Sequence, residues 1–327
     1  MQLVRYNAYS AYFRELFGSR VQKLSVDGGF SCPNRDGRCG TGGCTFCTNE
    51  AFNPSYCRRV ATITEQLDEG IAFHRHRYRS APSYLAYFQA YSNTYAPLEV
   101  LRERYDEALR HEGVVGLVVG TRPDCVDEAV LDLLADYAKE HYVAVEYGIE
   151  SCFDRTLETI NRGHNFACTQ RAVRATAERG LPVGGHLIFG LPGEGRDDLL
   201  AEMQIINALP LTTVKFHQLQ ILRGTEMERQ YRDENFRRSL LQFTLEEYIS
   251  LVCDLLERLR PDMVVERLAG EVPPRYQACP ERSFRRKNGH LLRNEEIPVL
   301  VEAELTRRGT RQGSLYAQLS SKEIHTP

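Results

Sequence analysis

The sequence lacks any apolar run that approaches the ~20 residues needed to cross a bilayer. Residues 1–13 are polar and rich in tyrosine, so they do not fit a secretory signal. We therefore expect a cytoplasmic protein with no membrane partner. The formal net charge is only −3, which argues against a protein that coats nucleic acid through bulk charge but leaves room for a local basic surface.

The chain also lacks low-complexity linkers and internal repeats, apart from an alternation of strand-like and helix-like segments. Its 327 residues suffice for one large α/β domain and a small appendage. Hydrophobic residues make up 42% and charged residues 26%, as is ordinary for a soluble globular protein. The fold must therefore be inferred from the pattern along the chain.

Six apolar, strand-like runs alternate with amphipathic, helix-like stretches. This alternation predicts a parallel sheet with right-handed crossovers. Periodicity alone does not separate an open doubly wound sheet from an incomplete barrel, but in both folds the functional groups gather at the carboxyl ends of the strands. The expected strands are Val21–Val26, Ser83–Phe88, Val114–Val119, Tyr142–Tyr147, Val183–Phe189 and Thr213–Ile221. The expected helices are Ile63–Tyr78, Pro97–His111, Val126–Glu140, Cys168–Arg179 and Arg196–Leu209.

The pattern changes after about Gly224, where strands and helices no longer alternate regularly. We expect a core over residues 1–235 and a C-terminal extension over residues 236–327, with a tail that frays from about residue 309. The elements expected in the extension are a helix with a capping box at Thr244–Glu247 that ends near Leu259, a strand candidate at Met263–Leu268, and a helix at Ile297–Arg307.

Four of the ten cysteines fall between positions 32 and 47, in a glycine-rich loop after the first strand. In a reducing compartment, a tight group of cysteines indicates a metal or catalytic site rather than disulfides. Three thiolates, from Cys32, Cys44 and Cys47, would hold a 4Fe–4S cluster with one iron open. Four thiolates, with Cys39 added, would suit a structural zinc site. Spacing alone leaves both open, but a position on the first loop of such an array favours a catalytic cluster.

Six short stretches near the expected strand ends carry further motifs. They are residues 28–37 (GGFSCPNRDG), 43–47 (GCTFC), 87–91 (YFQAY), 120–125 (GTRPDC), 160–164 (INRGH) and 190–194 (GLPGE). Together they resemble the radical S-adenosylmethionine (SAM) superfamily, and specifically its YhcC-like group, which is similar to the radical domain of the elongator catalytic subunit. The resemblance covers roughly residues 6–275. It implies a partial (β/α)6 TIM-type barrel with a small α+β C-terminal extension.

The resemblance also implies the cofactors. Cys32, Cys44 and Cys47 would bind a 4Fe–4S cluster, with Cys39 outside the triad. SAM would chelate the open iron, an electron would cleave its sulfonium bond, and the resulting 5′-deoxyadenosyl radical would abstract a hydrogen atom from the substrate. The cofactors supply this chemistry, and the protein supplies position and shielding. An electron donor such as flavodoxin or ferredoxin would be a partner, while the oligomeric state is left open.

Eight further positions are expected to contact SAM by the same resemblance. The chain lacks the GGE-type motif that many relatives carry after the second strand, so polar side chains there would replace backbone contacts. An ordinary polar turn would equally explain Ser92. A surface salt bridge would also explain Arg162, and a core position would also explain His186. Arg122 and Asp124 either help to line the substrate cavity or pair with each other. The eight positions are Gln89, Ser92, Asn93, Glu150, Arg162, His186, Ile188 and Leu222.

The sequence leaves the substrate open. A C-terminal run of basic and aromatic residues could hold RNA through phosphate contacts and base stacking, and elongator-like relatives modify tRNA. A solvated basic face would also explain the run. The alternatives are a radical enzyme that acts on a small metabolite or a protein, and a zinc-stapled binding module without catalytic activity. The run comprises Arg275, Tyr276, Arg282, Phe284, Arg285, Arg286, Lys287 and Arg293.

Overall fold

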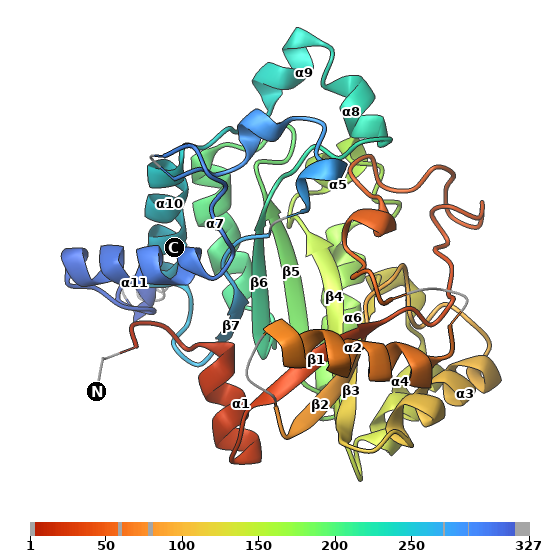
Figure 1. Cartoon of the computed structure of the whole chain (residues 1–327). Coiled ribbons are helices and arrows are strands. Elements are labelled where there is room, and N and C mark those ends of the chain that lie inside the picture. Colours follow the sequence, from red (N-terminus) through yellow and green to blue (C-terminus); the bar gives the residue numbers. More distant parts are fainter. Residues whose placement is uncertain (1–3, 58–60, 78–80, 271, 287, 318–327) are drawn as a thin grey trace, which may run out of the picture.

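Seven parallel strands form one sheet in the order in which they follow along the chain. The computed structural model describes residues 4–57, 61–77, 81–270, 272–286 and 288–317. The sheet curves into a half-barrel with helices on its outer side (Figure 1), which confirms the predicted α/β partial barrel. The candidate at Met263–Leu268 forms a seventh strand, one more than the six expected units. The strands are β1 Val21–Val26, β2 Ser83–Phe88, β3 Val114–Thr121, β4 Tyr142–Glu150, β5 Val183–Phe189, β6 Thr213–Gln218 and β7 Val264–Arg267.

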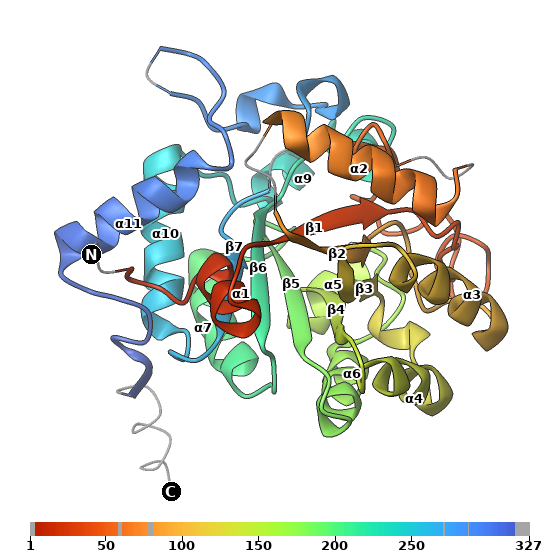
Figure 2. The same ribbon diagram turned by 60° about the horizontal axis from the view of Figure 1, so that its bottom comes forward.

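Helices that connect the strands cover the outer side of the half-barrel (Figure 2). Outward-facing strand residues such as Phe88, Val119 and Phe189 are fully buried in this layer. Asp127 and Asn165 cap the helices that follow them by accepting bonds from N–H groups of the first turn. None of the described helices is long and apolar enough to cross a membrane. The helices are α1 Tyr9–Phe17, α2 Ile63–Arg77, α3 Leu98–Leu109, α4 Glu128–Tyr137, α5 Asp154–Thr159, α6 Phe166–Glu178, α7 Arg196–Asn207, α8 Glu226–Gln230, α9 Glu234–Ser239, α10 Leu245–Arg258 and α11 Glu296–Arg308.

Helix α1, which the sequence pattern did not predict, closes the lower end of the half-barrel between β1 and β7 (Figures 1 and 2). Phe13 packs against Leu85 and Val118, which point inward from β2 and β3. The segment before the helix pairs with the last strand, because the backbone N–H of Val265 donates to the carbonyl of Asn7 at 2.7 Å. The start of the chain therefore bridges the two edges of the sheet.

An ion ring of four buried side chains crosses the inner side of the half-barrel. It consists of Lys23 on β1, Glu146 on β4, Lys215 on β6 and Glu266 on β7, with side chains 3–12% exposed. Each lysine contacts both glutamates, for example at 2.6 Å between Lys215 and Glu146. Burial alone would raise the pKa of Glu146, but Lys215 and Lys23 hold it well below its usual value. The ring joins both edge strands to the middle of the sheet.

Removing one cation should leave two buried carboxylates with a single lysine, so that one negative charge is not compensated. We expect Lys215→Met to lower the free energy of unfolding by ~3–5 kcal/mol, measured from urea unfolding curves. Arg238→Gln, which removes an exposed ion pair with Glu234 on α9, is the matched control and should leave the curve nearly unchanged. A Lys215→Met protein as stable as the wild type would contradict a structural role for the ion ring.

The C-terminal part of the chain is more closely joined to the sheet than expected. β7 lies beyond residue 235, the expected end of the core. The predicted capping box is confirmed, since the Thr244 N–H donates to the Glu247 carboxylate at 2.8 Å and the Thr244 hydroxyl accepts from the Glu247 N–H. The tail does not fray at residue 309, because the buried Gln312 amide donates to the carbonyl of Met263 at 2.8 Å. Residues 318–327 lie outside the described residues.

Two buried carboxyl groups, Glu194 and Glu202, lie where β5 leads into α7. Glu202 is 1% exposed and accepts a bond from the Cys152 N–H at 2.8 Å, while Glu194 accepts from the Ser151 hydroxyl at 2.5 Å. Burial and then the nearby Glu194 raise the pKa of Glu202 to about 8. The pair therefore retains a proton near neutral pH.

Because the pKa of Glu202 is raised on folding, the folded state keeps a proton that the unfolded chain has lost. Stability should then fall as the pH rises from the usual 4.5 to about 8. Glu202→Gln should reduce this slope by up to ~1.4 kcal/mol per pH unit, measured by urea unfolding across that range. Glu158→Gln, an exposed change on α5, should keep the wild-type slope, and an unchanged slope in Glu202→Gln would refute the assignment.

Candidate active site

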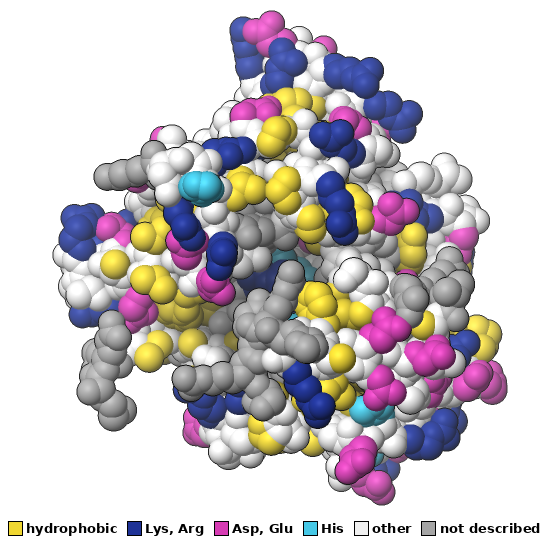
Figure 3. Space-filling model, viewed as in Figure 1, with side chains coloured by type: hydrophobic (Ala, Val, Ile, Leu, Met, Phe, Trp, Pro, Cys, Tyr) yellow, Lys and Arg dark blue, Asp and Glu magenta, His cyan; other side chains and the backbone are white. Residues whose placement is uncertain are grey.

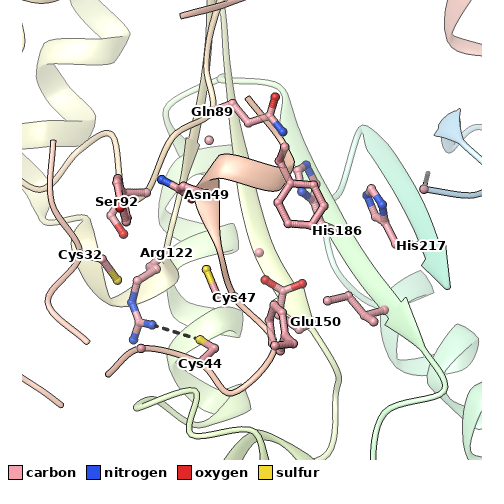
Figure 4. A pocket seen from close by; sticks show the side chains of 18 of the residues that line it. Cys32, Cys44, Cys47, Asn49, Gln89, Ser92, Arg122, Glu150, His186 and His217 are labelled. Atoms are coloured by element: carbon pink, nitrogen blue, oxygen red, sulfur yellow. Dashed lines mark hydrogen bonds between the residues drawn. The ribbon is translucent and has the colours of Figure 1, made fainter. Parts of the chain in front are cut away.

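A cavity of about 220 Å³ lies at the carboxyl ends of the strands (Figure 4). The loop over residues 28–47, which follows β1, supplies one end of it, and β2 to β6 supply the walls. All of the predicted site residues except Asn93 line the cavity. They are Cys32, Cys44, Cys47, Gln89, Ser92, Glu150, Arg162, His186, Ile188 and Leu222.

The cysteine triad, Cys32, Cys44 and Cys47, gathers at one end of the cavity (Figure 4). A turn links two of its members, since the Cys47 N–H donates to the Cys44 carbonyl at 3.0 Å. Gly43 adopts a φ of +81°, which favours glycine, and a Cβ there would meet Arg35 at 2.9 Å. Glycine at this position therefore lets the loop fold closely around its own cysteines.

Three arginine side chains surround the triad. Arg162 Nη1 lies 3.4 Å and Arg122 Nη1 lies 4.0 Å from the Cys44 sulfur, and Arg35 donates to the Cys47 carbonyl at 2.7 Å. Nearby cations favour thiolates and an anionic cluster. Burial and then the Cys44 sulfur raise the pKa of Cys47 to about 11, so metal binding at Cys47 would release a proton.

This donor set fits a 4Fe–4S cluster with three protein ligands. The thiolates of such a cluster bind separate irons, whereas the four ligands of a zinc site surround one ion at ~2.3 Å. Within the part of the chain that the structure describes, no three His, Cys, Asp or Glu side chains are placed to share one ion. Cys39 is exposed, and its sulfur lies 3.8 Å from the Asp124 carboxylate. Cys32, Cys44 and Cys47 line the cavity, whereas Cys39 does not.

Glu150 and Arg162 form an ion pair beside the triad, with 3.4 Å between Oε1 and Nη2. Glu150 has a φ of +66°, which is uncommon for a residue with a Cβ. Arg162 is only 6% exposed, so a surface salt bridge does not explain it. Together they offer a cation and an anion that match the carboxylate and the ammonium of an amino acid.

His186 faces the cavity and is also held by the core. Its Nε2 lies 3.0 Å from the carboxylate of Glu146 in the ion ring. Burial and then Lys215 lower the pKa of His186, so its imidazole is neutral near pH 7. The orientation of His186 at the cavity wall therefore depends on its bond to Glu146 of the ion ring.

Asn93 is placed differently from the prediction. Its side-chain amide donates to the carbonyls of Phe88 and Gly120 at 3.0 and 2.7 Å. It joins the ends of β2 and β3, because these two carbonyls are buried and need a donor. Arg122 combines both of its predicted alternatives, since it lines the cavity and pairs with Asp124 at 2.8 Å.

Residues 36–206 match the Radical SAM superfamily, and residues 211–295 match the Radical_SAM C-terminal domain. The chain belongs to the radical SAM superfamily. It is 40% identical to protein YhcC of Escherichia coli (strain K12) over 264 residues, and this match covers 80% of this chain and 82% of that protein. It is 36% identical over 319 residues to protein YtqA of Bacillus subtilis (strain 168), which covers 97% of this chain and 95% of that protein.

More distant radical SAM similarities extend to elongator-like proteins. The solved structure of Elp3 from the archaeon Methanocaldococcus infernus has a TM-score of 0.63 at 16% identity, and the match covers 91% of this chain and 67% of that chain. A tRNA uridine(34) acetyltransferase of Dehalococcoides mccartyi is 23% identical over 171 residues, or 51% of this chain and 36% of that protein. The protein is thus a radical SAM enzyme, from a family that uses SAM and a 4Fe–4S cluster.

Several residues of this radical SAM cavity were missed from the sequence. Phe46, next to Cys47, lines it, as do Tyr87 on β2 and His217 on β6. The period of two along a strand could have indicated His217, which lies two residues after the inward-facing Lys215. Phe46 carried no such periodic signal because it lies in an irregular loop.

The triad makes a direct prediction for metal binding. After anaerobic reconstitution, Cys44→Ala should lose the visible absorption band and most of its iron, because one of three iron ligands is gone. Cys39→Ala is the matched control from the same loop and should keep both. The measurement is iron and sulfide per chain. Loss of the cluster in Cys39→Ala, together with its retention in Cys32→Ala, would overturn the ligand assignment.

Proposed function

We propose that the protein is a radical SAM enzyme that acts on RNA, with tRNA as the favoured substrate and the cluster bound at the cysteine triad. Bound together, a 4Fe–4S cluster and SAM supply a 5′-deoxyadenosyl radical that can abstract a hydrogen atom from a substrate. The observation that carries the proposal is a cysteine triad at one end of a cavity whose rim bears aromatic and arginine side chains. An electron donor such as flavodoxin or ferredoxin would be the redox partner.

In this proposal the side chains of the cavity bind and orient SAM. Three cysteine ligands would leave one iron free for the amino acid part of SAM. Arg162 would pair with its carboxylate and Glu150 would accept from its ammonium. Ile188 and Leu222 offer apolar surface to the adenine, and Phe46 helps to keep water away from the reacting atoms. Gln89 and Ser92 would add polar contacts from the end of β2.

Aromatic side chains at and beside the cavity support an RNA substrate. Phe52 lines the cavity and is 42% exposed. Arg35 lies over the ring of Tyr91, which also lines the cavity, at 5.8 Å, and Arg275 lies over Tyr276 at 4.9 Å. Such pairs combine a charge that attracts phosphate with a ring on which a base can stack.

The charges available to RNA differ from the predicted basic run. Arg286 pairs with Glu296 at 2.6 Å, and Lys287 lies outside the described residues. Arg282 and Arg285 have no carboxylate partner among the residues that are described. Figure 3 shows further basic side chains over α8 and α9, where Arg229 and Arg238 pair with Glu226 and Glu234. The relative named a tRNA uridine(34) acetyltransferase acts, by that name, on tRNA, which supports the same substrate class.

Comparing RNA nucleosides from cells with and without the protein tests the substrate. We expect at least one modified nucleoside to disappear on deletion, because its synthesis needs the radical step. Wild type and Cys39→Ala should restore it, whereas Cys44→Ala should not. The measurement is mass spectrometry of digested tRNA.

The chemistry is tested separately from the substrate. The reduced, reconstituted enzyme should release 5′-deoxyadenosine from SAM, and Cys44→Ala should not. An unchanged nucleoside profile from an enzyme that cleaves SAM would count against RNA and favour a small metabolite or a protein. Failure to cleave SAM despite a full cluster would count against the radical mechanism itself.

A further inference from the structure

The end of the cavity away from the cysteine triad carries a histidine that no other part of the site uses. His217, at the end of β6, lines the cavity beside His186, with 5.9 Å between the ring centroids (Figure 4). His186 is bonded to Glu146. His217 has no hydrogen-bond partner for either ring nitrogen among the described residues. It is a polar group at the cavity wall with its bonding capacity free.

The backbone of Gly270 lies close against the His217 ring. The Gly270 N–H donates to Gln218 Oε1 and the Gly270 carbonyl accepts from Gln220 Nε2, both at 2.9 Å. A Cβ at position 270 would lie 2.5 Å from His217 Nδ1. Glycine at position 270, held by two glutamines, therefore leaves the space that the imidazole occupies.

Among the described side chains, the charge at this end of the cavity is positive. The ion ring is balanced, with two lysines against two glutamates. Arg267 lies opposite Lys215 in the register of β6 and β7. Its side chain is exposed and forms no ion pair or hydrogen bond with any described residue. Burial and then the charge of Arg267 lower the pKa of His217 well below its usual value. The sheet register also relates the two side chains, since Arg267 is the β7 neighbour of Lys215 and His217 follows Lys215 by two residues on the same face of β6.

We propose that Arg267 and His217 form a subsite for an oxyanion of the substrate, a phosphate or a carboxylate group. The guanidinium supplies charge and paired N–H donors, and the imidazole supplies a further donor. The subsite lies away from Glu150 and Arg162, the proposed contacts of the SAM amino acid. Figure 3 shows Lys or Arg and His side chains at the bottom of a hollow near the centre of the face that it draws. The proposal holds whether or not the substrate is RNA.

Diethyl pyrocarbonate, which modifies neutral imidazoles, tests the subsite on the reconstituted full-length enzyme. Modification of His217 is quantified by mass spectrometry in chloride, inorganic phosphate or acetate at equal ionic strength. We expect phosphate or acetate to slow this modification by at least about fivefold near saturation, because a bound oxyanion occupies the imidazole. Slower modification in phosphate indicates a phosphate subsite, and slower modification in acetate indicates a carboxylate subsite.

Variants of Arg267 assign the protection to the subsite. Arg267→Gln should abolish it, and Arg267→Lys, which keeps the charge, should retain part of it. Arg232→Gln, an exposed arginine between α8 and α9, is the matched control and should keep full protection. The thermal midpoint of each variant checks its fold. Protection by neither anion, protection that persists in Arg267→Gln, or full protection by SAM alone would overturn the proposal. No SAM cleavage enters the measurement, so it can fail or succeed independently of the proposed function.

Discussion

The ion ring is the interaction on which the inside of the half-barrel depends. Apolar residues of similar volume can replace such a buried network without loss of stability, so the ring is not simply a source of free energy. The ring sets the distance between the edge strands β1 and β7, because Lys23 and Glu266 can form their ion pair at only one separation of these strands. Glu146 in turn bonds to His186, so the ion ring sets the position of a side chain in the cavity wall.

Much of the sheet could be predicted because buried parallel strands are short apolar runs between polar turns. Val21–Val26, Ser83–Phe88 and Val183–Phe189 were predicted with their observed bounds. Helix α1 was not, because its buried side consists of Tyr and Phe side chains in a polar segment. What buries them is the inner side of strands that come much later in the chain, and a local pattern does not contain that information.

The site was predictable where its chemistry is local in sequence. The cysteine triad stands out within one loop, and Arg162 within one motif. Asn93 was assigned to the cavity because a polar residue after a strand can turn either toward a ligand or toward neighbouring carbonyls. The buried carbonyls of Phe88 and Gly120 decide its orientation. The period of two along β6 could have indicated that His217 faces the cavity, but the space for its ring depends on Gly270, which follows a different strand.

Contacts between the N-terminal and C-terminal parts of the chain affect the order of assembly during translation. Asn7 bonds to Gln312, 305 positions later, and Lys23 waits for Glu266, 243 positions later. At ~5–20 residues per second, roughly 12–50 s separate the synthesis of these two ring members. The cysteine loop thus leaves the ribosome long before the barrel can close. Iron and sulfide for the proposed cluster would meet more accessible thiols in that interval than in the folded protein, where Cys44 is buried and Cys32 and Cys47 are half-buried.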